Sequence, residues 1–138
     1  MSVTHVFDTS ALLAHYFGEP GAEELDRVWA DPDNEIGICV LSLPELKTRL
    51  SAEVDDPAEI ARAFQAYADK LTVSLQVDRM VAERAIELRE ASRGRLPLVD
   101  SVIAATASCQ SAILVHCDRH MAGIPEDRLR QRFVGPAE

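Results

Sequence analysis

The sequence predicts an α/β protein with a mainly parallel central sheet, and two observations support this fold class. Short apolar runs alternate with helical patterns along the whole chain, and this alternation is typical of strands joined by right-handed helical crossovers. Residues 112–115 read Ala-Ile-Leu-Val, a short run that is apolar on both faces, as in parallel strands covered on each side. We therefore expect helices on both sides of the sheet.

A single domain is expected to span residues 1–138, because this length and a hydrophobic content of 47% allow one sizeable core. The chain has no apolar run of about 18 residues, and its start, MSVTHVFDTS, lacks the basic and apolar regions of a signal peptide. We expect a soluble, cytoplasmic protein with no membrane partner. Cys39, Cys109 and Cys117 form no CxxC pair, so we expect reduced thiols in or beside the core.

Two helix starts in the first half of the chain carry acidic residues. Asp8, Thr9 and Ser10 follow an apolar strand at residues 5–7, and all three favour a helix start. Because one residue suffices as the cap, another of the three is available for a different role. In the helix predicted at residues 42–52, Ser42 is the expected cap and Glu45 has the spacing of a capping box, which is a structural explanation for Glu45.

The remaining elements follow from apolar periodicity and from turn residues. Residues 71–77 alternate between apolar and polar side chains, which predicts a strand with one solvated face. Asp78 is expected to cap the next helix, whose inner face is predicted to consist of Val81, Ala85, Ile86 and Leu88. The full set of further elements is a helix at 22–30, a strand at 36–40, a helix from 57 to about 71, a helix at 79–91 and an edge strand at 129–134.

The stretch LPLVDSVIAATASCQSAILVHCD at residues 96–118 organises the rest of the chain. Pro97 is tolerated at a helix start, so the helix is expected to begin near Leu98 or Val99, with Asp100 in its first turn. Nearly every face of this helix is apolar or small, which is typical of a buried helix. Asp118 follows the strand at 112–115, at its carboxyl end, where ligands bind in open α/β sheets.

Four carboxylates are expected to converge at one edge of the sheet. Asp8 and Asp118 follow strands, while Glu45 and Asp100 lie near helix starts. Crowded carboxylates raise one another's pKa and cost stability, and a cation relieves this repulsion. Oxygen-only ligation suits Mg²⁺ or Mn²⁺. Such a site can activate a water for in-line attack on a phosphodiester.

The net charge of −9 argues at first against a nucleic-acid ligand. However, residues 1–69 hold 14 acidic and 4 basic residues, whereas residues 70–138 hold 9 acidic and 10 basic ones. A bound divalent cation would invert the local field of an acidic cluster and let it meet a phosphate. The charge therefore permits an RNA substrate, and it favours a basic partner.

Three segments resemble the three blocks of PIN-domain proteins of the VapC toxin type, in order and in approximate spacing. They are VFDTSALLAHYFGEPGAEEL, LSLPELKTRL and LPLVDSVIAATASCQSAILVHCD. No single block is specific by itself, but the ordered set is, and the match covers nearly the whole chain. The resemblance implies a PIN-like three-layer α/β/α domain.

The resemblance also implies an activity, a Mg²⁺-dependent endoribonuclease that is the toxin of a toxin–antitoxin pair. It would hydrolyse phosphodiester bonds of structured RNA, where single-stranded or looped segments expose the bases. Mn²⁺ is a possible substitute for Mg²⁺. The catalytic and metal-binding positions of the family fall on Asp8, Glu45, Asp100 and Asp118, and Ser10 matches the hydroxyl residue that supports the first aspartate. Family members usually form homodimers and are silenced by an antitoxin whose tail enters the acidic site.

The basic residues near the expected site have two interpretations. Arg93, Arg95 and Arg119 are candidate RNA contacts, and a solvated loop role explains them equally well. His116 and His120 flank Asp118, and a continued strand would make a softer metal site of the three. We expect a turn there instead, which disfavours that site.

Three other functions are less well supported, and two of them need residues that the sequence lacks. A haloacid-dehalogenase-type phosphatase needs a second aspartate where Ser10 stands, and a receiver domain needs a late lysine, whereas Lys70 is the last lysine. The alternative that stays open is a catalytically inactive PIN-like module that binds RNA or protein. The presence of all four acids disfavours it, since like charges are costly to keep together.

Overall fold

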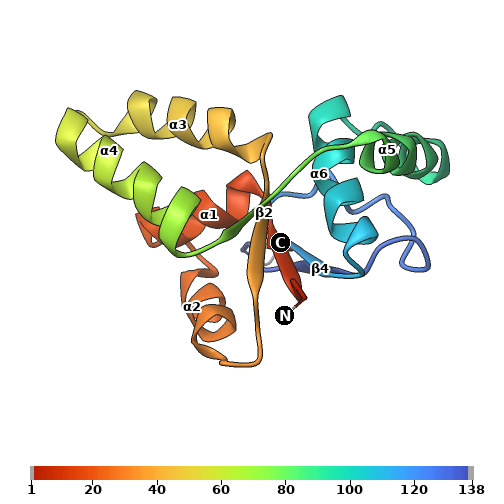
Figure 1. The fold of residues 1–138 in the computed structure, drawn as a ribbon, viewed down its shortest axis with the longest axis horizontal. Helices are drawn as coiled ribbons and strands as arrows, with labels where there is room; N and C mark the ends of the chain where they lie inside the picture. Colours follow the sequence, from red (N-terminus) through yellow and green to blue (C-terminus); the bar gives the residue numbers. More distant parts are fainter. Residues whose placement is uncertain (1, 137–138) are drawn as a thin grey trace.

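Parallel strands form the central sheet of the computed structural model, which describes residues 2–136 (Figure 1). The strands are β1 (His5–Phe7), β2 (Ile36–Cys39), β3 (Val73–Leu75), β4 (Ile113–His116) and β5 (Gln131–Phe133). Their order across the sheet is β3-β2-β1-β4-β5. Every neighbouring pair is parallel, so the predicted mainly parallel sheet is confirmed.

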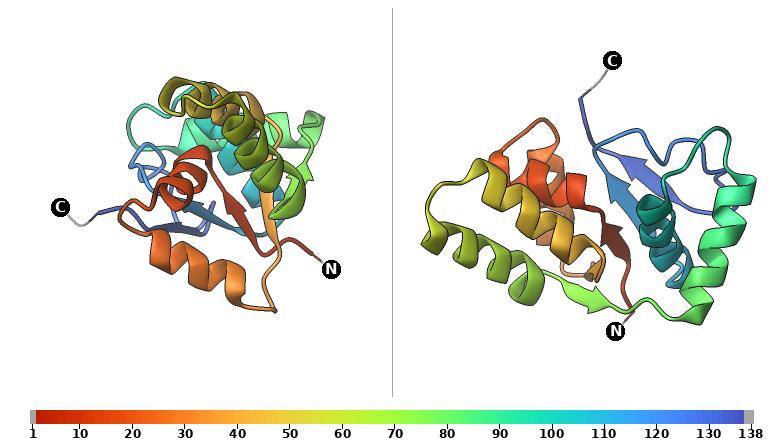
Figure 2. Two further views of the ribbon diagram at one scale, coloured as in Figure 1. Left: turned by 90° about the vertical axis from the view of Figure 1, so that its left-hand side faces the viewer. Right: turned by 90° about the horizontal axis from the view of Figure 1, so that it is seen from above.

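Helices cover both faces of this sheet. They are α1 (Thr9–Phe17), α2 (Ala22–Ala30), α3 (Ser42–Glu53), α4 (Pro57–Gln65), the π-helical turn η1 (Ala66–Lys70), α5 (Arg79–Ala91) and α6 (Leu98–Cys109). Helices α1 to α4 lie on one side of the sheet and α5 with α6 on the other (Figures 1 and 2). The three-layer α/β/α architecture is thereby confirmed.

Alternation along the strands divides the core between the two faces. Val6 and Leu114 pack with buried residues of α5 and α6. The next residues, Phe7 and Val115, pack with buried residues of α1, α2, α3 and η1. Successive strand residues point to opposite faces, so each short strand contributes to both apolar layers. This double burial explains why residues 112–115 are apolar without a break.

The order of the strands places a switch in chain direction between β1 and β4. The chain builds β1, β2 and β3 outward on one side, then crosses over to add β4 and β5 on the other. Phe7 pairs with Val115 at the carboxyl ends of β1 and β4. In open α/β sheets, the crevice beyond the carboxyl ends at such a switch is where ligands bind.

Helix α3 begins at Ser42, as expected, but the predicted capping box is wrong. Leu41, not Ser42, is the N-cap, and no side chain caps this helix. The hydroxyl of Ser42 is buried without a hydrogen-bond partner among the described residues. Glu45 is therefore not part of a capping box, and capping does not explain its presence.

Two further predictions fail in detail. The strand predicted at residues 71–77 is only Val73–Leu75, because its single partner β2 ends at Cys39, which pairs with Leu75. Ile86 is 58% exposed rather than core, whereas the burial predicted for Val81, Ala85 and Leu88 on α5 is confirmed. The helix expected to run to about residue 71 ends at Lys70, and its last turn, η1, is π-helical.

The three cysteines form no disulfide among the described residues. Cys39, Cys109 and Cys117 are free, as expected, and Cys39 is buried. Within residues 2–136, no helix combines the length and the apolar character that crossing a bilayer requires.

Candidate active site

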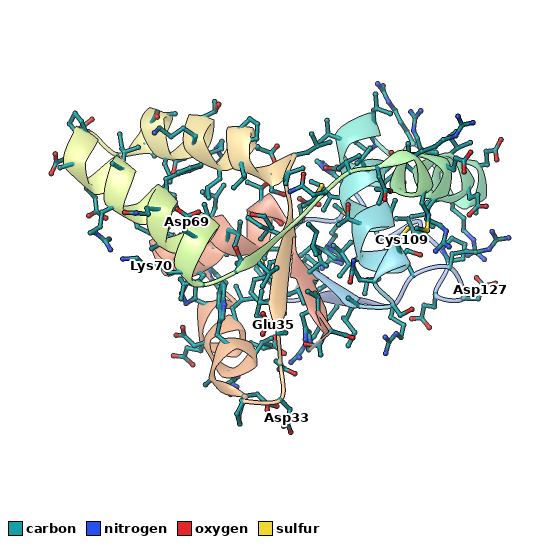
Figure 3. All side chains as sticks on the ribbon, viewed as in Figure 1. Asp33, Glu35, Asp69, Lys70, Cys109 and Asp127 are labelled. Atoms are coloured by element: carbon teal, nitrogen blue, oxygen red, sulfur yellow. The ribbon has the colours of Figure 1, made fainter. Side chains whose placement is uncertain are left out.

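A pocket of about 200 Å³ opens at the carboxyl edge of the sheet, and we call it the acid pocket. Its lining comes from the end of β1, from α1, α3 and α6, and from the loop after β4. The lining residues are Asp8, Thr9, Ser10, Leu13, Glu45, Arg49, Asp100, Ile103, Asp118 and His120. All four acids predicted from the sequence are therefore in one pocket. Asp33 and Glu35, which precede β2, mark the opposite edge of the sheet in Figure 3.

Asp8 is the most buried of the four acids, with 3% of its surface exposed. It directly follows β1 and caps α1, where its Oδ1 atom accepts a hydrogen bond from the Ala11 amide at 2.9 Å. The pKa of Asp8 is raised to about 7, mainly by burial and in smaller part by the charges of Asp118 and Asp100, while its hydrogen bonds to Ser10 and Ala11 act in the opposite direction. A carboxylate in this position is costly to ionise unless a cation is nearby.

Ser10 connects Asp8 to the segment that carries Asp118. Its hydroxyl donates to Asp8 Oδ1 at 2.7 Å and accepts from the Cys117 amide at 2.9 Å. Both hydrogen bonds to the Asp8 side chain thus end on the same oxygen, Oδ1. Ser10 orients Asp8 and at the same time fixes the backbone immediately before Asp118.

Asp100 and Asp118 face each other across the pocket from α6 and from the loop after β4. Asp100 lies in the first turn of α6, as the sequence predicts, with its side chain 18% exposed. Burial raises the pKa of Asp100, and the charges of Asp118 and Glu45 act in the same direction. The Asp118 Oδ1 atom accepts the His120 amide at 3.0 Å, which folds this loop into a turn over the pocket.

The two histidines beside Asp118 lie in different environments, which excludes the softer site made of both. His116 is buried, and its ring nitrogens lie 2.6 Å from the Asp118 carbonyl and 2.9 Å from the Gln131 side chain. His120 instead lines the acid pocket, with Nδ1 3.1 Å from Asp100 Oδ2 and 3.7 Å from Asp118 Oδ1. The predicted turn is present, but it brings His120 to the acids.

Helix α3 contributes Glu45 and Arg49 to the pocket. Residues four apart lie on the same face of a helix, so Arg49 follows Glu45 toward the same opening. Sequence reasoning missed both Arg49 and His120 as pocket residues. The helical spacing from Glu45 was the available signal for Arg49, whereas the path of the turn after β4 decides the place of His120.

The arginines predicted to contact RNA lie elsewhere on the described surface. Arg93, Arg95 and Arg119 are exposed and are not part of the acid-pocket lining. Arg93 lines a separate hollow, and the guanidinium of Arg119 lies 4.0 Å from the Phe133 ring centre. Contact between these three residues and RNA stays a prediction.

The donors of the acid pocket have the chemistry that a hard divalent cation requires. They are carboxylate oxygens, the ligands of Mg²⁺ and Mn²⁺. Burial first, and then the charges of the neighbouring acids, raise the pKa of both Asp8 and Asp100. In residues 2–136, however, no three His, Cys, Asp or Glu side chains are already grouped closely enough to hold one ion. The residue types and charges fit a cation, and its binding is a proposal.

Comparisons with known proteins agree on the fold. The family model described as "PIN domain" matches residues 5–127. No curated protein matches the sequence.

Solved structures with the same fold cover almost the whole chain. VapBC2 from Rickettsia felis, bound to a promoter DNA fragment, has a TM-score of 0.74 at 18% identity, covering 94% of this chain and 98% of that one. VapBC-5 from Mycobacterium tuberculosis has a TM-score of 0.66 at 24% identity, covering 97% and 99%. VapC20 from the same organism, described as a sarcin-ricin loop cleaving toxin, has a TM-score of 0.66 at 19% identity, covering 89% and 98%.

Proposed function

This chain belongs to the PIN-domain family, and from that premise we propose that it is a Mg²⁺-dependent endoribonuclease, the toxin of a toxin–antitoxin pair. One observation carries the proposal. Four carboxylates from distant parts of the sequence line a single pocket at the switch between β1 and β4. Burial makes ionisation of Asp8 unfavourable, and the charges of Asp118 and Asp100 add to this cost. A divalent cation would offset it.

The proposed cation ligands are Asp8, Asp100 and Asp118, with Glu45 at the side of the pocket. When bound, Mg²⁺ or Mn²⁺ supplies charge neutralisation and activation of water for attack on a phosphodiester. The chain's own contribution is orientation. Ser10 holds the Asp8 carboxylate through Oδ1, and the turn at Asp118 places His120 against Asp100.

The proposed substrate is structured RNA, cut where a loop exposes its bases, because sequence-specific recognition of RNA mostly reads unpaired bases. VapC20, which shares the fold, is described as cleaving the sarcin-ricin loop, and this supports the substrate class. We further propose a cytoplasmic location, an antitoxin partner and a homodimer. The neighbouring VapBC structures support the antitoxin, and light scattering coupled to size exclusion tests the dimer.

Cleavage of total cellular RNA by the purified protein tests the proposed activity. We expect discrete fragments with Mg²⁺ or Mn²⁺ and none with a chelator. Asp100→Asn should abolish cleavage with folding intact, because it removes one of the proposed cation ligands from the pocket. Asp33→Asn is the matched control, since it removes an exposed carboxylate at the opposite edge of the sheet.

The same experiment separates the enzyme from an inactive binding module. Cleavage that persists in chelator or in Asp100→Asn would contradict the carboxylate site. A folded, antitoxin-free wild-type protein that binds RNA but cleaves none with either metal would support the module instead.

A further inference from the structure

We propose that Arg49 binds a backbone phosphate of the RNA at the acid pocket, and that Glu53 holds the Arg49 side chain when no RNA is bound. This inference rests on the proposed ribonuclease function and adds a substrate-binding residue to it. The supporting observations are the position of Arg49 on α3, its present contact, and the charge of the pocket around it.

The helix places Arg49 at the pocket. Arg49 follows Glu45 by four residues on α3, and both line the acid pocket. Leu46 and Leu50 are fully buried and fix the rotation of this helix against the core. The side of α3 that carries Glu45 and Arg49 is therefore held in place, while the two polar side chains themselves are exposed.

Arg49 is a basic residue of the pocket lining, and its ion pair is with a residue outside that lining. Of the two basic side chains that line the described pocket, His120 contacts Asp100 and Asp118. The contact of Arg49 is with Glu53, at 3.4 Å, and Glu53 does not belong to the pocket lining. The guanidinium thus lies at the mouth of the pocket with its partner outside it.

The pair between Arg49 and Glu53 is weak enough to exchange for a ligand. Its nitrogen–oxygen distance is long, and the two side chains are 53% and 46% exposed. Exposed ion pairs of this kind contribute little, because water screens them and both side chains lose freedom. A phosphate oxygen that approaches the pocket can therefore replace the Glu53 carboxylate at small cost.

A phosphodiester needs such a group at this pocket. Four carboxylates repel an approaching phosphate, and a bound cation compensates only part of that charge. Arginine is suited to the task because its planar guanidinium stays charged and donates two parallel hydrogen bonds to phosphate oxygens. The position of Arg49 lets it contact a phosphate beside the cation ligands without occupying their place.

RNA binding tests the proposal directly. The probe is a fluorescently labelled, mixed-sequence single-stranded RNA, and its binding is measured by anisotropy at several NaCl concentrations, in the Asp100→Asn background so that the probe is not cleaved. Arg49→Gln should weaken binding about tenfold, the effect of one charged hydrogen-bonding contact. It should also lower the slope of log affinity against log salt by about 0.7, as expected for one phosphate contact on a single strand.

Glu53→Gln should have the opposite effect on RNA affinity. Because it removes the partner of Arg49 in the free protein, it should tighten RNA binding. The double variant, Arg49→Gln with Glu53→Gln, should bind RNA like Arg49→Gln alone. Arg79 and Glu83 on α5 are the matched control pair, since they also form an exposed i,i+4 contact, at 3.1 Å, outside the acid pocket. Arg79→Gln and Glu83→Gln change the net charge equally and should change binding less than twofold.

Kinetics with the cleaving enzyme distinguish binding from a structural role. Arg49→Gln should raise KM with kcat little changed, because a phosphate contact made equally in ground state and transition state is lost from both. Arg49→Lys keeps the charge and should recover the salt slope.

Equal affinity and salt slope with Arg49 and with Gln at position 49, or no RNA binding in either case, would overturn the role of Arg49. Failure of the wild type to cleave RNA with metal would instead overturn the proposed function.

Discussion

At the scale of single residues, Asp8 shows how one side chain can serve both fold and site. Its Oδ1 atom accepts the Ala11 amide at 2.9 Å, and Asp78 accepts the Val81 amide at 3.0 Å in the same way at the start of α5. Either contact explains an aspartate at a helix start. Only Asp8 is also buried in a pocket with other carboxylates. Capping and a role in the site are therefore compatible at Asp8.

The raised pKa of Asp8 predicts a pH-dependent effect of Asp8→Asn on metal-free stability. Well below the ordinary pKa of 3.8, the carboxyl is neutral in both the folded and the unfolded chain, so the variant and wild type should be equally stable. Between the ordinary pKa of 3.8 and the folded value of about 7, the unfolded chain ionises first and wild type loses stability. Above pH 7, Asp8→Asn should be more stable, by at most about 4 kcal/mol.

Thermal melts in chelator from pH 5 to pH 8.5 measure this difference. Asp33→Asn again serves as the comparison, because Asp33 is exposed and lies outside the pocket. An Asp8→Asn protein that is less stable than wild type at pH 8 would mean that the cap, not the charge, dominates at this position.

At the scale of elements, the sequence predicts most of the helices and strands but not their ends or exposed faces. Nearly continuous apolar or small residues identify α6 and β4, because most of both elements is buried. The capping pattern at Ser42 is misleading, since Ser42 is already the first residue of the helix and its hydroxyl is buried. The length and apolar character of a segment do not determine where a helix or strand ends or which face is exposed, because these depend on the neighbouring elements.

The same limit applies to the site. The positions of Asp8 and Asp118 follow from a general rule for the carboxyl ends of parallel strands. Arg49 and His120 depend instead on the rotation of α3 and on the turn after β4, and neither is a property of the local sequence. Four acids can therefore be found from the sequence, while the basic residues beside them need the structure.

The link that Ser10 makes between α1 and the segment after β4 leads to an element-scale prediction. Ser10→Ala removes the hydrogen bond to Asp8 and leaves the Cys117 amide without its acceptor. We expect the free energy of unfolding to fall by about 1–3 kcal/mol and RNA cleavage to fall with it. Urea denaturation and the RNA cleavage assay measure the two effects.

Ser108 offers a matched control for Ser10. Its hydroxyl also joins two elements, since it accepts from Arg84 at 2.6 Å and donates to the Arg128 carbonyl at 3.2 Å. It lies outside the acid pocket. Ser108→Ala should therefore leave cleavage unchanged, and an equal loss of cleavage in both variants would contradict a site-specific role for Ser10.

At the scale of the whole molecule, charge and topology act together. The net charge of −9 comes mainly from the first half of the chain, yet the switch between β1 and β4 joins acids of both halves in one pocket. Any salt screens the overall negative charge and can stabilise the fold in a general way. A cation that binds in the pocket must therefore be distinguished from this screening.

Mg²⁺ should raise the melting temperature of the wild type more than NaCl of equal ionic strength. A ligand that binds only the folded state stabilises it by RT ln(1 + [L]/Kd), so the shift should grow with Mg²⁺ concentration, and chelator should reverse it. Asp100→Asn should lose most of this shift, while Asp33→Asn should keep it. If NaCl reproduced the full effect of Mg²⁺, the four carboxylates would be an acidic surface that salt screens, and the metal-dependent step would lose its support.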